Sequence, residues 1–247
     1  MNSTLSTQPQ LTADYQCFSH AKRNKIANRY SKDVTNLYLD LRAAPPRDRE
    51  PRLAALGRVI PLLVCGEQSA ISVFGASAQE NVVNNEHMLR REFMRIEAEE
   101  MGHELLWQSL AASLPIPEDA TRLKRQAALF FAKLGRANSI GEHFAQVSQL
   151  DSAVGAMMWC LERSEVAKDQ RIHGIANLIK KEEARHVAVS RRFALGLGVP
   201  RDHFQALGAK IRQELISLLL PVADSIEALG IDASVMFRRI GRSGGVS

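Results

Sequence analysis

The chain has 247 residues, of which 45% are hydrophobic, and a formal net charge of +5. This length and composition allow a substantial core and are compatible with one large helical domain. The positive excess would help to attract anionic partners, but it is modest. No aromatic-studded nucleic-acid motif accompanies the basic groups near the N-terminus, so they are better read as a solvated face.

The sequence shows no sign of export or membrane insertion. No stretch approaches the roughly 18 uninterrupted apolar residues that a membrane span needs. Residues 1–10 are polar and lack the apolar core of a secretory signal. Cys17, Cys65 and Cys160 are odd in number and lack zinc-type spacing, so we expect free thiols. We therefore predict a cytoplasmic protein that does not contact a membrane.

Helical periodicity begins after a polar arm and continues almost to the C-terminus. The predicted helices span about residues 18–42, 52–77, 86–113, 118–134, 139–161, 172–195, 201–220 and 222–237. The first is basic and amphipathic. A proline-rich break follows it at 43–51, and an Asn-rich turn at 81–85 joins the first two long helices. No strand-like alternation is found.

Two Glu-x-x-His spacings, Glu100 to His103 and Glu183 to His186, lie in long predicted helices. Positions i and i+3 share one helix face, so each pair can aim a carboxylate and an imidazole at one point. A carboxylate from each of two more helices would complete a two-metal cage in a four-helix bundle. One such spacing would indicate little, since a salt-bridging solvent face gives the same pattern. The pair predicts a metal site.

Glu67 is a further predicted ligand, because it lies on a largely apolar helix face. A buried carboxylate is costly there unless it is paired or bound to metal. Glu67 and Glu100 are 33 residues apart, and their midpoint falls in the turn at 81–85. An antiparallel hairpin would place both carboxylates at the same height.

The remaining carboxylate should come from the helix at 139–161 or its end. We favour Glu162, which follows the apolar run 153–161. Asp151 is the second choice, since its 32-residue separation from Glu183 is close to the spacing in the first hairpin, and Glu165 is the third. The predicted metal ligands are Glu67, Glu100, His103, Glu162, Glu183 and His186.

With these residues, segment 52–195 resembles the ferritin-like di-iron carboxylate superfamily. The run Glu-Glu-Ala-Arg-His at 182–186 is similar to one common in its oxygenase branch. The resemblance implies an all-α fold, a ferritin-like four-helix bundle with additional N- and C-terminal helices. It also implies that Arg185 orients carboxylates around the metals. We expect an N-terminal arm and basic helix at 1–50, the di-metal bundle domain at 51–240 and a flexible tail at 241–247.

The resemblance implies a non-haem di-iron oxygenase that uses O2 to hydroxylate or N-oxygenate a small molecule, free or bound to a carrier protein. Carboxylates and neutral imidazoles suit two iron ions, with manganese left open, and an external donor would supply electrons. Alternatives are a tRNA-hydroxylase-like enzyme whose basic arm meets RNA, an iron-storage protein and a metal-free helical scaffold. The additional helices and the basic balance argue against a storage cage. A homodimer is compatible with the sequence.

Overall fold

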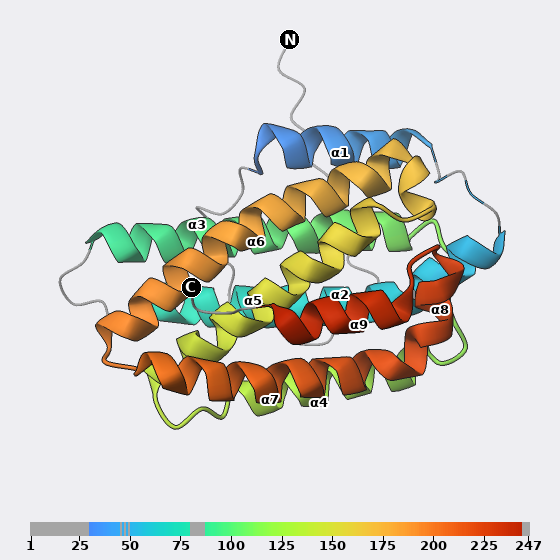
Figure 1. Cartoon of the computed structure of the whole chain (residues 1–247). Coiled ribbons are helices and arrows are strands. Elements are labelled where there is room, and N and C mark those ends of the chain that lie inside the picture. Colours follow the sequence, from blue (N-terminus) through green and yellow to red (C-terminus); the bar gives the residue numbers. More distant parts are fainter. Residues whose placement is uncertain (1–29, 45, 47, 49, 80–86, 244–247) are drawn as a thin grey trace, which may run out of the picture.

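The computed structural model describes residues 30–44, 46, 48, 50–79 and 87–243, and the regular structure in these residues is entirely helical. The helices are α1 (Lys32–Ala43), α2 (Glu50–Gln79), α3 (His87–Ala111), α4 (Ala120–Leu134), α5 (Ile140–Glu162), α6 (Gln170–Gly196), α7 (Arg201–Leu219), α8 (Ala223–Ala228) and α9 (Ala233–Arg242), with short 3₁₀ turns at Val166–Lys168 and Leu220–Val222 (Figure 1). The prediction of an all-α helical bundle is confirmed.

Two long helix pairs form the centre of the bundle. Helix α2 packs along α3, and α5 packs along α6, while α3 and α6 also touch each other (Figure 1). Helix α1 lies across α3 and α6, and α4 and α7 cover α2 and α5. This arrangement directs one face of each of the four long helices toward a common interior.

Side-chain caps explain where α5 and α6 begin. The Ser139 hydroxyl caps α5 by accepting a hydrogen bond from the Glu142 backbone N–H at 3.1 Å. The Asp169 carboxylate caps α6 by accepting from the Arg171 N–H at 2.9 Å. Only residues 163–169 separate the two helices, so they run antiparallel over nearly their whole length.

One predicted helix is wrong, and two predicted segments fall outside the described residues. The helix expected at 222–237 is two helices, α8 and α9, separated by a turn. Gly230 has a φ of 81° in this turn, a backbone conformation that is strained for residues other than glycine. Residues 18–29 of the first predicted helix and the turn at 81–85 are not described.

Helix α2 is long and apolar enough to cross a membrane by length and composition alone. However, 61% of its most apolar window is buried inside the protein, as in a core helix of a soluble bundle. Arg58 joins this helix to two others: it donates to Asp119 before α4, to Asp224 in α8 and to the Pro221 carbonyl. The apolar side chains of α2 are therefore mostly buried against the other helices, and Arg58 anchors the helix to two neighbouring elements.

The cysteines differ from the expectation of free thiols. Cys160 is a free, buried thiol. Cys65 is disulfide-bonded, so the expectation is wrong for this residue. Cys17 lies outside the described residues, and the cytoplasmic location stays a prediction.

Candidate metal centre

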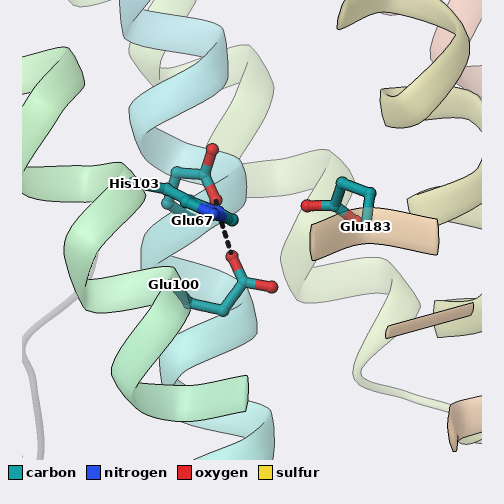
Figure 2. A group of neighbouring side chains, drawn as sticks. All are labelled: Glu67, Glu100, His103 and Glu183. Carbon is teal, nitrogen blue, oxygen red and sulfur yellow. Dashed lines mark ion pairs between the residues drawn. The ribbon is translucent and has the colours of Figure 1, made fainter. Parts of the chain in front are cut away.

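Six buried side chains from the four long helices meet in the interior of the bundle. They are Glu67 of α2, Glu100 and His103 of α3, Asp151 of α5, and Glu183 and His186 of α6, hereafter the buried cluster. Ligand atoms of Glu67, Glu100, His103 and Glu183 lie within 4.8 Å of one another (Figure 2), and so do those of Asp151, Glu183 and His186. The two groups share Glu183, which gives the cluster two adjoining halves.

Glu100 connects the two histidines. His103 Nδ1 lies 3.3 Å from Glu100 Oε2 and 3.4 Å from Glu67 Oε2. His186 Nδ1 lies 2.9 Å from Glu100 Oε1 and 3.7 Å from Glu183 Oε2. Both imidazoles thus turn Nδ1 toward the carboxylates, and both carboxylate oxygens of Glu100 face an imidazole.

Several donor and acceptor atoms of the buried cluster lie within ion-pair distance of one another but make no hydrogen bond of suitable geometry. Among the described residues these buried atoms include Glu100 Oε2, His103 Nδ1, Asp151 Oδ2, Glu183 Oε2 and His186 Nδ1. Such atoms cost free energy when left unpaired, and native structures rarely leave them so. All five are atoms that can ligate a metal, and the four carboxylates would balance two divalent cations. The residues therefore fit a two-metal centre.

The electrostatics of the buried cluster show the cost of holding these charges together. Burial raises the pKa of Glu67, Asp151 and Glu183, and neighbouring carboxylates raise it further. Burial acts to lower the pKa of His103 and His186, but the surrounding glutamates override it and hold both well above the usual value. Bound cations would relieve the repulsion among the carboxylates and displace the imidazole protons.

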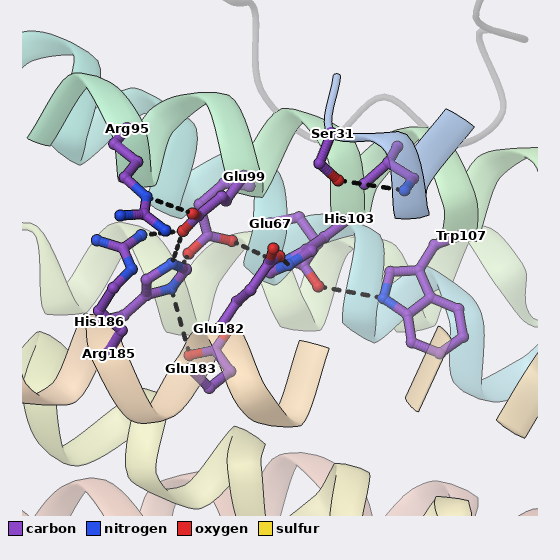
Figure 3. A network of polar contacts seen from close by, with 12 residues as sticks. Ser31, Glu67, Arg95, Glu99, His103, Trp107, Glu182, Glu183, Arg185 and His186 are labelled. Atoms are coloured by element: carbon purple, nitrogen blue, oxygen red, sulfur yellow. Dashed lines mark hydrogen bonds and ion pairs between the residues drawn. The ribbon is translucent and has the colours of Figure 1, made fainter. Parts of the chain in front are cut away.

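A second layer of side chains holds both histidines from behind (Figure 3). His103 Nε2 contacts Glu182 Oε2 at 2.7 Å, and His186 Nε2 contacts Glu99 Oε2 at 2.9 Å. Carboxylates in this position orient metal-bound imidazoles and make them better ligands. The sequence reasoning missed both roles, although the repeated Glu-Glu-x-x-His at 99–103 and 182–186 carried the signal.

Arg185 and Trp107 complete this layer. Arg185 forms an ion pair with Glu99 and donates to Glu92 Oε2 at 2.9 Å, so it positions a carboxylate beside His186. The Trp107 indole N–H donates to Glu67 Oε1 at 3.1 Å. Trp107 is fully buried, one helical turn beyond His103, and its role was also missed.

The structure does not bring Glu162 into the buried cluster, and Asp151 lies where Glu162 was expected. Glu162 contacts Lys180 at 2.6 Å and Arg163 at 2.5 Å. It is 11 residues beyond Asp151 on α5, about 16 Å along a helix. The expected helix bounds, 161 and 172, already centre the turn near the midpoint of Asp151 and Glu183, so the error lay in choosing Glu162 for its place after the apolar run. Glu165, the third choice, pairs with Lys168 at the surface.

A narrow apolar cavity of about 90 Å³ adjoins the buried cluster between α2, α4, α5 and α7. Glu67, Glu100, Asp151 and Glu183 form its polar end. Its other walls are mainly apolar and include Leu62, Ala70, Val73, Phe131, Val147, Leu150, Val154 and Leu215. Gln146 also lines it, with its buried Oε1 atom lacking a hydrogen bond. The cavity has the size for O2 or a slender apolar group beside the carboxylates.

Comparison with known proteins gives no further assignment. No protein-family model, curated protein or solved structure matches the chain. What is established is therefore an all-α bundle with buried Glu, Asp and His side chains that could hold metal ions.

Proposed function

We propose that the protein is a ferritin-like, non-haem di-iron oxygenase acting on a small molecule. One observation carries the proposal: six ligand side chains from four helices converge in the interior, and five of their buried donor or acceptor atoms have no hydrogen bond. Mixed carboxylate and imidazole ligands suit iron, and also manganese. In the helical bundles that hold di-iron or di-manganese centres, ligands are projected inward from four helices in this way.

The apolar cavity favours an oxygenase over an iron store. A storage centre must pass hydrated ions, for which a polar path is suited. Here the walls next to Glu67 and Asp151 are mostly aliphatic and aromatic. Such walls exclude water and can hold an apolar substrate against the metal ligands.

Two bound iron ions would supply electrons for the reduction of O2. In the proposed reaction one oxygen atom of O2 enters a C–H or N–H bond of the substrate, and the other leaves as water. An external donor supplies two electrons, which would replace those given up by the two irons, and two protons complete the water molecule, so that the net reaction balances. The chain's own contribution is to hold the ligands, through Glu99 and Glu182, and to keep water from the substrate side.

The test is anaerobic loading with Fe(II), followed by metal analysis by plasma mass spectrometry and an absorption spectrum after O2 is admitted. We expect about two irons per chain and a visible band that forms and decays. Stoichiometric iron without any O2-dependent change would support a metal site but contradict the oxygenase. Absence of stoichiometric metal would contradict both and favour the helical scaffold.

A further inference from the structure

A second cavity, separate from the buried cluster, lies between α5, α6 and α9 and has a volume of about 590 Å³. Helix α9 packs on α5 beside it (Figure 1). The ten residues that line the cavity include Ala156, Trp159, Lys180, Arg238, Arg239 and Arg242. Four of these ten residues are cationic and none is acidic.

The positive charge of this cavity is only partly balanced. Lys180 pairs with Glu162, which also pairs with Arg163. Within the described part of the chain, Arg238, Arg239 and Arg242 form no ion pair with a carboxylate. Asp232 lies near Arg238, but its carboxylate accepts hydrogen bonds from the Ser234 hydroxyl and the Val235 N–H at the start of α9. Several like charges therefore face one space, an arrangement that an anion would stabilise.

Trp159 holds one of the guanidinium groups in place. The Arg239 guanidinium carbon lies 3.4 Å from the Trp159 ring centroid, and that of Arg163 lies 4.0 Å from it. Stacking uses the flat face of a guanidinium and leaves its in-plane N–H donors available. Arg239 is thus pre-oriented, and Arg238 and Arg242 lie on the same helix within one turn of it.

We propose that this cavity binds a small phosphorylated molecule, with its phosphate held by the arginines of α9 and by Lys180. A phosphate group presents several charged oxygens that match guanidinium forks, which a single carboxylate does not. The cavity volume falls in the range of small-molecule sites and leaves room for an organic portion against Trp159 and Val235. This site does not depend on metal in the buried cluster.

The test is calorimetric titration of the metal-free protein with inorganic pyrophosphate at low salt. We expect one site per chain, weakened more than about tenfold by the double variant Arg238→Ala/Arg242→Ala. The control is Arg90→Ala/Arg91→Ala on α3, which removes the same charge from two exposed arginines away from the cavity. This control should change the affinity less than about twofold, because Arg90 and Arg91 lie on α3, which does not line the cavity.

A steric variant separates the cavity from general electrostatic attraction. Ala156→Phe adds bulk to the cavity wall without changing charge and should abolish pyrophosphate binding, with circular dichroism confirming the fold. Equal weakening by both double variants, or no effect of Ala156→Phe, would overturn the proposal. Tighter binding of a single-stranded RNA oligonucleotide that is insensitive to Ala156→Phe would also overturn it, since the α9 face would then be an RNA surface.

Discussion

His103 on α3 is held by Glu182 on α6, at 2.7 Å, and the reciprocal contact joins His186 on α6 to Glu99 on α3 at 2.9 Å. Each helix thus provides one imidazole and the carboxylate that supports the imidazole of the other helix. In both cases the supporting residue directly precedes a glutamate of the buried cluster, Glu100 or Glu183. Because of these crossed contacts, the distance between α3 and α6 affects how the two imidazoles are oriented in the buried cluster.

The crossed contacts predict that Glu99→Gln or Glu182→Gln weakens metal binding by about ten- to a hundredfold, since the imidazole loses its orienting carboxylate. Metal titration under anaerobic conditions measures the change. Glu92→Gln is the matched control, because Glu92 also binds Arg185 but touches neither histidine. If Glu92→Gln and Glu99→Gln weaken binding equally, the effect arises from Arg185 and not from the support of His186.

Substitution of Asp151 and of Glu162 should have different effects on the metal content, because only one of these two acids of α5 lies in the buried cluster. Asp151→Asn should remove about one metal ion per chain, because Asp151 groups with Glu183 and His186 in one half of the buried cluster. Glu162→Gln should leave the metal content unchanged, since Glu162 lies at the end of α5 in contact with Lys180. Plasma mass spectrometry of both variants decides between them, and the reverse result would restore Glu162 as a ligand.

The metal-free protein should lose stability as the pH rises above about 5. Three carboxyl groups and both imidazoles of the buried cluster have raised pKa values, so the folded chain binds their protons more tightly than the unfolded chain does. Stability contributed by such groups is present below the unfolded pKa and is lost as the pH passes through the folded one. Among other shifted groups, His143 has a pKa lowered by burial and acts in the opposite sense.

Thermal unfolding at several pH values tests this expectation. The unfolding temperature of the metal-free protein should decrease as the pH is raised from 5 to 8. Added Mn²⁺ should reverse this decrease, because the cations replace the bound protons. Asp151→Asn should reduce the pH dependence by removing one buried acid. A metal-free midpoint that rises over this interval would contradict the arrangement of charges described for the buried cluster.

Arg58 should contribute more to stability than its neighbour Arg122. Both contact Asp119, but Arg58 also donates to Asp224 and to the Pro221 carbonyl, and its side chain is half as exposed. Arg58→Ala should lower the free energy of unfolding by about 1–2 kcal/mol, whereas Arg122→Ala should cost less than about 0.5 kcal/mol. Urea unfolding of the two variants measures the difference, and equal losses would show that the additional contacts contribute nothing.

Much of the candidate metal centre could be predicted, because helical periodicity is a local property. The three-residue spacing places Glu100 with His103 and Glu183 with His186 on single helix faces, whatever surrounds them. Glu67 could be predicted for a similar reason, since an antiparallel hairpin places residues that are equally distant from its turn at the same height. For the acid of α5 the same reasoning favours Asp151, because the midpoint of Asp151 and Glu183 lies in the turn between α5 and α6, whereas Glu162 was chosen for the apolar run before it. The observed end of α5 and start of α6 differ from the expected ones by one and two residues, so the position of the turn was predicted well and the choice of the acid was wrong.

The sequence by itself determined the helical class and five of the six side chains that meet in the buried cluster, because both follow from patterns within one helix or one hairpin. Only the tertiary structure decided that Asp151 completes the cluster and that Glu99 and Glu182 support the histidines from the facing helix. It also placed the arginines of α9 around Trp159 of α5. The repeated Glu-Glu-x-x-His indicates an acid beside each cluster glutamate, but which side chain it meets on the facing helix depends on the register and packing between helices.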